Sequence, residues 1–204
     1  MSTITPDEDE YYELPAGKLA TVVTYLEMRQ RPRPRLSAPR PDLGLRLVDL
    51  PDVGEYLTLF RRIGENLMWT SRLIMAEDKL RDILHDPLNE VRIVTAMGRE
   101  IGLLELDFRK PGECELAFFG VVPEAVGTGV GRWLMTQAHL LAWRPGIERF
   151  WLHTCDLDHA NALAFYLRSG FKAYKRAVEI GTDPRLTGSF PRTAAPQIPL
   201  IESS

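Results

Sequence analysis

The sequence predicts a mixed α/β (α+β) fold, in which a mostly antiparallel sheet contains one splayed parallel pair of strands and is flanked by helices. Three strand-like runs, at 91–97, 101–108 and 115–122, follow one another through the turn sequences M-G-R-E and K-P-G-E. Connections this short require antiparallel hairpins. A glycine-rich turn, a helical pattern and an apolar run at 150–155 then form a crossover, which makes the last two strands parallel neighbours. Such a change of pairing opens a gap where a ligand can enter between strands.

The composition is that of a soluble globular protein. Of the 204 residues, 45% are hydrophobic and 26% are charged, and no apolar run has the length of a membrane span. The acidic N-terminus lacks the apolar region of a signal peptide, so we expect a cytoplasmic location and no membrane partner. The net charge of -3 gives no general reason to expect a nucleic-acid partner.

Three segments are expected along the chain. Residues 1–42 form an N-terminal extension, with a solvated acidic start, one strand at 19–28 and a connector of five arginines and four prolines between Arg29 and Pro41. The connector is interpreted as an extended linker, although its arginines could also bind an acidic partner. Residues 43–180 form the compact domain, and 181–204 form an irregular tail. Because the strand could pair with a sheet edge of the same chain or of a second subunit, a homodimer stays open.

The compact domain is expected to begin with a strand at 45–48. Pro51 and Asp52 then open a helix that ends near residue 62 or 64, and a second helix covers about 76–84. The segment between these helices places Trp69 and Arg72 among apolar residues. These two side chains are candidate substrate contacts, and the alternative is that the aromatic ring only fills the core.

The third strand carries a candidate catalytic carboxylate. Simple alternation puts the odd-numbered residues from Glu115 to Val121 on one face and the even-numbered residues from Leu116 to Val122 on the other. Glu115 would then lie on a partly buried face, where the pKa of a carboxylate rises toward that of a useful base.

The turn after this strand contains three glycines, Gly127, Gly129 and Gly131. Glycines let the backbone bend sharply and approach a ligand, and the amides at the start of the following helix favour an anion. The spacing matches neither the dinucleotide fingerprint nor the P-loop. The turn therefore either binds a phosphate or only relieves strain between strand and helix.

Two helices and a strand complete the domain. A helix that begins near Val130 ends before Pro145, and another covers 158–169, with an aspartate at 156 or 158 as its cap. Gly170 ends this helix, and the last long strand covers 171–180.

No metal site is expected, although several residues of the types that bind metals lie near the strand at 150–155. They fall on a strand, a turn and a helix start, which would scatter them in space. The cysteines are too few for a disulfide framework and are interpreted as small, reduced, buried side chains. The residues of metal-binding type are His153, Cys155, Asp156, Asp158 and His159, and the two cysteines are Cys114 and Cys155.

Two motifs together resemble those of a known family. The run Val126 to Gly131, preceded by a V-x-P element at 121–123, is similar to the pyrophosphate loop [Q/R]-x-x-G-x-[G/A] of the GNAT superfamily of N-acetyltransferases. The run Asn161 to Phe171 is similar to the family's segment N-x-x-A-x-x-[F/Y]-Y-x-x-x-G-F, in slightly contracted form. The resemblance covers about residues 43–180 and implies the transfer of acetyl from acetyl-CoA to an amine of a small molecule or peptide.

The resemblance also implies which residues bind the cofactor. Val126 stands where the family usually has Arg or Gln, so one polar contact is missing, and Arg132 could supply a compensating charge. This departure keeps open a CoA-binding regulatory module without catalysis. Asn161 would bond the pantetheine arm or cap its own helix. The implied cofactor-binding residues are Val121, Val122, Val126, Gly127, Thr128, Gly129, Val130, Gly131, Arg132, Asn161 and Tyr166.

The reaction asks for three further groups. A strand amide near Val122 would polarise the thioester carbonyl. Tyr166 matches the family tyrosine that protonates the departing sulfur, since a phenol with a pKa of about 10 is protonated at neutral pH. Glu115 is the first candidate for the base, with Asp107 or Glu105 as alternatives, because a primary amine with a pKa of about 10.4 must lose a proton before it attacks.

Overall fold

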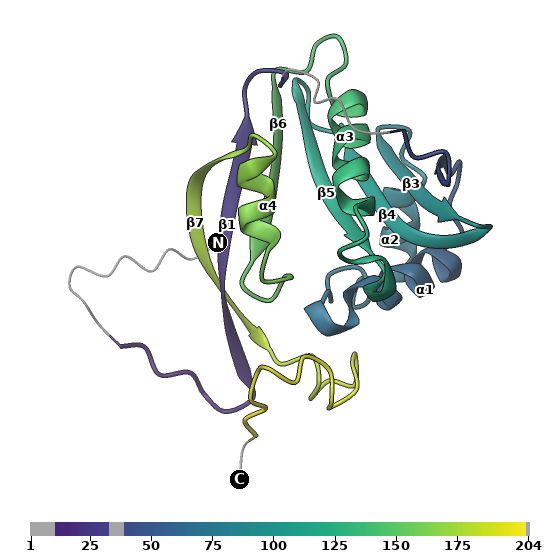
Figure 1. Cartoon of the computed structure of the whole chain (residues 1–204). Coiled ribbons are helices and arrows are strands. Elements are labelled where there is room, and N and C mark those ends of the chain that lie inside the picture. Colours follow the sequence, from purple (N-terminus) through teal and green to yellow (C-terminus); the bar gives the residue numbers. More distant parts are fainter. Residues whose placement is uncertain (1–10, 33–38, 203–204) are drawn as a thin grey trace.

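A computed structural model describes residues 11–32 and 39–202, and within them one seven-stranded sheet has the order β2-β3-β4-β5-β6-β1-β7 (Figure 1). The expectations for the acidic start and for the middle of the connector fall on 1–10 and 33–38, outside these residues. The strands are β1 (Lys18–Met28), β2 (Leu43–Leu47), β3 (Asn89–Ala96), β4 (Arg99–Asp107), β5 (Glu113–Val121), β6 (Arg149–Cys155) and β7 (Lys172–Thr182). The helices are α1 (Val53–Gly64), α2 (Glu77–Leu84), α3 (Val130–Ala142) and α4 (Ala162–Arg168), with two 3-10 turns, η1 (Glu65–Leu67) and η2 (Pro123–Ala125).

The antiparallel meander is confirmed. Strands β2 to β5 pair in sequence order, each antiparallel to the next. The helix after β2 also begins as expected, because the side chain of Asp52 accepts a hydrogen bond of 2.9 Å from the amide of Glu55. This half of the sheet is therefore built from local connections that the turn sequences dictate.

The predicted parallel pair is confirmed, and it is short. The β5–β6 pairing runs from Glu113 opposite Arg149 to Glu115 opposite Trp151. Beyond that point the two strands diverge, while β6 continues to pair with β1 up to Cys155 (Figure 1). One side of β5 therefore faces the splay, and the wide end of the splay lies where the glycine turn follows β5.

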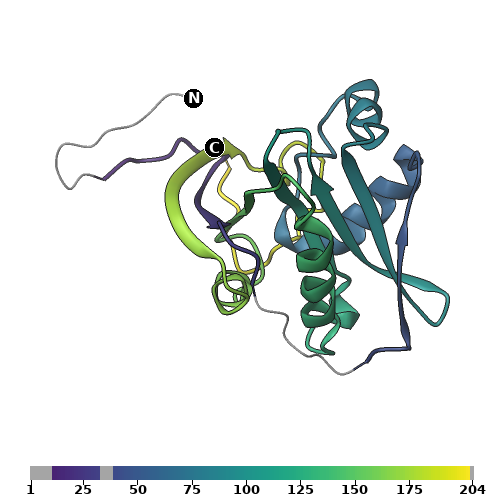
Figure 2. The same cartoon turned by 90° about the horizontal axis from the view of Figure 1, so that it is seen from above.

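The N-terminal strand is an interior strand of this sheet. β1 lies between β6 and β7 and pairs antiparallel with both. Of the two pairings that the sequence left open for this strand, the structure contains the one within the same chain. Since β2 forms the opposite edge of the sheet, the two strands on either side of the connector, β1 and β2, lie in different halves of the sheet (Figure 2).

The helices form a layer on each face of the sheet. α1 and α2 cover one face and α3 and α4 the other (Figures 1 and 2). The main core lies between these layers, and it includes the fully buried side chains of Phe60, Leu134 and Phe150. Among the described residues, no helix is long and apolar enough to span a membrane.

A bulge interrupts the pairing of β4 with β5. Phe118 lies opposite Glu105, and the next pair joins Leu116 to Leu106, so Ala117 is an extra residue without a partner of its own. A bulge of this kind displaces the side chains on either side of it by one position relative to strict alternation.

The expected distribution of side chains along β5 is therefore wrong. Glu115 lies opposite Asp107, two residues from Glu105 on β4, and so shares the α1 face with Phe118. Phe118 packs edge-on against Phe60 of α1, whereas Phe119 stacks on Phe165 of α4. The extra residue thus moves Glu115 to the face opposite Phe119, away from the position that alternation predicts.

The expected start of the final helix is also wrong. α4 begins at Ala162 and not near Asp158, because the carboxylate of Asp158 is used elsewhere. Its two oxygens accept hydrogen bonds from the Thr154 hydroxyl at 2.6 Å and from the indole Nε1 of Trp69 at 3.0 Å. The end of the helix at Gly170 is confirmed, where φ is +106°.

The C-terminal residues 183–202 contain no helix or strand but are anchored to the domain. The guanidinium of Arg185 is paired with Asp183 and also donates to the carbonyl oxygen of Ile198 at 2.8 Å. Phe190 and Ala195 are buried in a small second cluster with Met68. The segment therefore packs against the end of η1 through polar and apolar contacts.

Candidate functional site

The glycine turn forms the start of α3. Gly127 and Gly129 have φ values of +81° and +86°, which only glycine adopts at low cost. The first hydrogen bond of the helix runs from the amide of Trp133 to the carbonyl oxygen of Gly129, at 3.1 Å. The amides of the first turn of α3, before Trp133, have no carbonyl oxygen inside the helix to bond. They are therefore available to an anion, and the positive end of the helix dipole favours an anion at this position.

Gly131 has no internal reason to be a glycine. It lies in the first turn of α3, and a Cβ atom built on it would meet no described atom within 4 Å. Gly127 is equally open. A glycine inside a helix lowers stability relative to alanine, so open space at this position is best explained by a ligand that approaches the backbone closely. The turn thus fits the diphosphate of a CoA molecule.

The amide near Val122 that was expected to be unpaired is engaged. It donates to the carbonyl oxygen of Ile101 on β4 at 2.9 Å, so the expectation is wrong for Val122 itself. Because successive amides of a strand point to opposite sides, the amides of Phe119 and Val121 are directed toward β6. Val121 therefore occupies the position beside the splay.

Tyr166 is buried on the inner side of α4. Its ring contacts Phe119 of β5 and Phe171, both edge-on. Burial raises the pKa of the Tyr166 hydroxyl well above its usual value, and the nearby charge of Asp158 acts in the same direction. The phenol is thus protonated at neutral pH and can act only as a proton donor.

Asn161 occupies the N-cap position of α4 without capping it through its side chain. The side chain is exposed, as is that of Arg132 in the first turn of α3. Neither residue is needed by its own helix. Thr128 is different, since its hydroxyl donates to the carbonyl oxygen of Ala125 at 2.7 Å and thereby holds the turn together.

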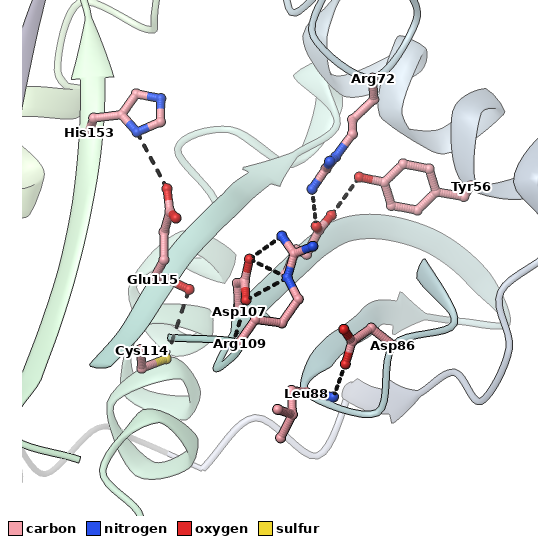
Figure 3. A network of polar contacts seen from close by, with 10 residues as sticks. Tyr56, Arg72, Asp86, Leu88, Asp107, Arg109, Cys114, Glu115 and His153 are labelled. Carbon is pink, nitrogen blue, oxygen red and sulfur yellow. Dashed lines mark hydrogen bonds and ion pairs between the residues drawn. The ribbon is translucent and has the colours of Figure 1, made fainter. Parts of the chain in front are cut away.

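The three candidate carboxylates lie on the α1 face of β4 and β5, in different surroundings (Figure 3). Glu105 is fully buried, where it pairs with Arg72 and accepts a hydrogen bond of 2.6 Å from the hydroxyl of Tyr56. Asp107 is held by Arg109 through several hydrogen bonds. Burial opposes the ionisation of Asp107, but these bonds outweigh it and hold the pKa of the carboxyl below its usual value.

Glu115 has a weaker partner. One of its carboxylate oxygens lies 3.6 Å from Nδ1 of His153, on the neighbouring strand β6 (Figure 3). The nearby carboxylate of Glu115 raises the pKa of His153, while burial opposes the rise. Of the three candidates, Glu115 alone faces an imidazole and not a guanidinium among the contacts described.

Trp69 is half-buried and Arg72 is buried. The indole of Trp69 packs on Gly64 and Gly120, since a Cβ atom built on either glycine would lie within 3 Å of the ring or its Cβ. Its Nε1 reaches Asp158, so Trp69 bridges α1, β5 and the segment after β6. Arg72 is only 7% exposed, and its guanidinium also lies over the ring of Phe118.

Neither cysteine has the character of a nucleophile. Burial raises the pKa of the Cys114 thiol far above its usual value, and that of Cys155 to about 11. In the described part of the chain, no group of three or more His, Cys, Asp or Glu side chains is placed to hold a metal ion.

Two further contacts of this site were not predicted from the sequence. His153 was considered only as a metal ligand, and its link to Glu115 depends on the pairing of β5 with β6. Arg40, in the connector, reaches the glycine turn and donates from Nη1 to the carbonyl oxygen of Thr128 at 3.2 Å. No local pattern signals this second contact, because 88 positions separate the two residues.

Comparisons with known proteins agree with this geometry. A curated relative, a mycothiol acetyltransferase from Jonesia denitrificans, is 33% identical over 107 residues, which are 48% of this chain. The match covers 34% of that relative, so the chain spans about a third of its length.

Solved structures share the fold. A GCN5-related N-acetyltransferase from Sphaerobacter thermophilus has a TM-score of 0.60 at 15% identity, over 79% of this chain and 51% of that one. An aminoglycoside acetyltransferase from an uncultured soil metagenomic sample has a TM-score of 0.53 at 17% identity, over 68% of this chain and 93% of that one. Residues 64–171, more than half of the chain, match the family model described as the acetyltransferase (GNAT) family. The chain belongs to this acetyltransferase (GNAT) family.

Proposed function

We propose that the chain is an N-acetyltransferase that moves the acetyl group of acetyl-CoA to a primary amine, by direct attack within a ternary complex. The observation that carries the proposal is the open glycine turn at the start of α3, next to the wide end of the splay between β5 and β6. The glycine turn would bind an anion, and the side of β5 that faces the splay has amides without a partner strand. In acetyl-CoA, the diphosphate would occupy the turn and the acyl thioester would lie beside β5.

The turn would bind the diphosphate mainly through its backbone. The amides of Val130 and Gly131 lie in the first turn of α3, where helix geometry leaves them unbonded. Open space at Gly127 and Gly131 lets the phosphates approach them. Val126, 46% exposed, adds no polar group, so side chains elsewhere must supply any charge.

The amide of Val121 would stabilise the negative charge that develops on the thioester oxygen. A fixed donor that points at the developing charge, in a place shielded from water, is the usual form of this catalysis. The amide of Val122 cannot serve, because Ile101 occupies it. The proposed donor is therefore the amide of Val121, which lies next to the position near Val122 that the sequence indicated.

Tyr166 would protonate the sulfur as the thioester breaks. Its hydroxyl is protonated throughout the physiological range, and the aromatic contacts with Phe119 and Phe171 hold the ring in one orientation. The proton that it loses can return through water after the products leave.

Glu115 would receive the proton of the amine. Its two rivals are occupied by guanidinium groups, Glu105 by Arg72 and Asp107 by Arg109. Glu115 lies six positions before Val121 on β5. At a rise of ~3.3 Å per residue, the Cα atoms of these two residues are at most about 20 Å apart. The proton would therefore reach Glu115 through intervening water and not by direct contact.

The acceptor is proposed to be a primary amine of a small molecule or a peptide. Trp69 would form a wall of the acceptor site, since it bridges the wide end of the splay from Gly120 to Asp158. Arg72 would act as a support for this wall through Phe118 and Glu105, because its buried guanidinium is already engaged.

Two measurements test the proposal. Acetyl-CoA should raise the melting temperature of the purified chain, and CoA release should be detected with at least one member of a broad panel of primary amines.

A change at Tyr166 tests its proposed role as the acid. Tyr166→Phe should lower kcat at least ~100-fold, which is the lower range of general acid catalysis, while the Kd for acetyl-CoA stays within about twofold. Tyr11→Phe, a change at a fully exposed tyrosine, is the matched control and should alter neither value.

The results also separate the enzyme from a regulatory module. Binding of acetyl-CoA without CoA release from any amine would favour a module that senses CoA, a reading that Val126 supports because it departs from the family pattern. Absence of both binding and turnover would refute both proposals.

A further inference from the structure

We propose that Arg40, in the proline- and arginine-rich connector, binds the diphosphate of acetyl-CoA and replaces the polar side chain that the glycine turn lacks at Val126. This inference rests on the proposed function. It assigns to one residue of the connector a place in the cofactor site, although the connector lies outside the segment that matches the family model.

The position of the guanidinium is the first support. Arg40 donates from Nη1 to the carbonyl oxygen of Thr128 at 3.2 Å, in the centre of the turn. The same nitrogen lies 3.4 Å from the point that a Cβ atom on Gly129 would occupy. Gly129 is the N-cap of α3, so the positive charge lies directly at the end of the helix that favours an anion.

The orientation of the guanidinium is the second support. Asp42 accepts hydrogen bonds from Nε at 2.9 Å and from Nη2 at 2.7 Å, and so holds the planar group by one edge. Together with the bond to Thr128, these contacts use three of the five N–H groups of an arginine. The remaining two can bond phosphate oxygens without breaking the pair, and the side chain is 28% exposed and so accessible to a ligand.

The requirement for a charge is the third support. A diphosphate carries negative charge that backbone amides alone neutralise only in part. Val126 supplies none, and the nearby acidic side chain of Glu124 opposes binding at its exposed position. The hydrogen bond to Thr128 does not by itself require a cation, because a neutral donor can also bond a carbonyl oxygen.

The test compares equilibrium binding of acetyl-CoA to the full-length chain and to Arg40→Gln by calorimetry. The variant should bind roughly tenfold more weakly, as expected for one charge-assisted contact at a partly exposed site. Because the loss is electrostatic, the ratio of the two Kd values should shrink as the salt concentration rises from 0.05 to 0.5 M, about the range over which screening lengths fall below 10 Å. Arg81→Gln, which removes an exposed arginine paired with Glu77 on α2, is the charge-matched control and should leave the Kd unchanged.

A second variant separates a lost charge from a distorted turn. Val126→Arg in the Arg40→Gln background places a cation at an exposed position of the same turn and should restore at least half of the lost binding free energy. A Kd for Arg40→Gln equal to that of the unmodified chain would overturn the inference, as would a loss that is independent of salt and is not restored by Val126→Arg. If the unmodified chain itself fails to bind acetyl-CoA, the proposed function fails, and the inference fails with it.

Discussion

Arg72 and Glu105 form an ion pair that is buried between the α1 layer and the sheet, although they come from a loop and a central strand. The carboxylate also accepts a hydrogen bond of 2.6 Å from the hydroxyl of Tyr56, so it joins two side chains away from water (Figure 3). A carboxylate buried in this way is stable only while its partner is present.

Removal of this cation should therefore be costly. Arg72→Met should lower the free energy of unfolding by about 3–5 kcal/mol, because Glu105 is left charged without a partner or must take up a proton. Urea denaturation measures the difference. Arg81→Gln, which breaks the exposed pair with Glu77, should cost less than about 1 kcal/mol.

The double variant Arg72→Met with Glu105→Gln isolates the buried charge. It should recover part of the loss, since a neutral amide tolerates the same site better than an unpaired carboxylate does. If Arg72→Met costs no more than Arg81→Gln, the pair does not contribute to stability as proposed.

Gly131 should show opposite effects on stability and binding. Gly131→Ala should raise the free energy of unfolding by about 0.5–1 kcal/mol without ligand, because alanine is the better helix residue and its Cβ meets open space. The same Cβ should weaken acetyl-CoA binding by blocking close approach to the amides of α3. Thermal unfolding with and without acetyl-CoA measures both. A stabilised variant that binds acetyl-CoA normally would show that no ligand approaches this position.

Replacement of Gly120 by alanine should lower the stability of the fold, whereas the same replacement at Gly131 should raise it. A Cβ atom on Gly120 would lie 2.5 Å from Ile63 and 2.8 Å from Trp69. Gly120→Ala should therefore cost about 1–3 kcal/mol through overpacking. Gly181→Ala on β7, where a Cβ meets nothing within 4 Å, is the matched strand control and should be neutral or slightly stabilising. Equal effects of the two changes on chemical denaturation would contradict the packing assigned to Trp69.

The pKa of His153 should report on Glu115. The nearby carboxylate raises the pKa of His153 above its usual value, so Glu115→Gln should lower it again. The imidazole proton signals of the folded protein, followed by NMR as the pH is changed, measure the shift. Glu77→Gln on the remote helix α2 is the control, and an unchanged pKa in Glu115→Gln would remove Glu115 as the cause.

The same pair predicts the sign of a pH effect on stability. Because the pKa of His153 is raised in the folded state, its interaction with Glu115 stabilises the fold fully below the pKa of an unfolded histidine, near ~6.5. This contribution is lost as the pH rises through the higher pKa of the folded protein. Since the side chain of His153 is 49% exposed, solvent screens the interaction and the effect should be small.

Much of the fold followed from local chemistry. Short turns dictated the antiparallel hairpins from β3 to β5, Asp52 capped α1, and the glycine turn between strand and helix indicated a crossover and so a parallel pair. These features are determined by residues a few positions apart, whose preferences for turn, cap or strand the sequence displays directly. The two motifs around this crossover were also sufficient to indicate the family.

Contacts between distant segments were decided only by the tertiary structure. The bulge at Ala117 reversed the faces of β5, and Asp158 left the helix to bind Trp69, because the pairing with β4 and the packing of the indole outweigh local preferences. The link of Arg40 to Thr128 depends on β1 and β2 lying in opposite halves of one sheet, which the connector must join. The sequence alone thus determined the glycine turn between strand and helix, and the tertiary structure decided which distant side chains surround it, since long-range contacts are set by sheet order and register.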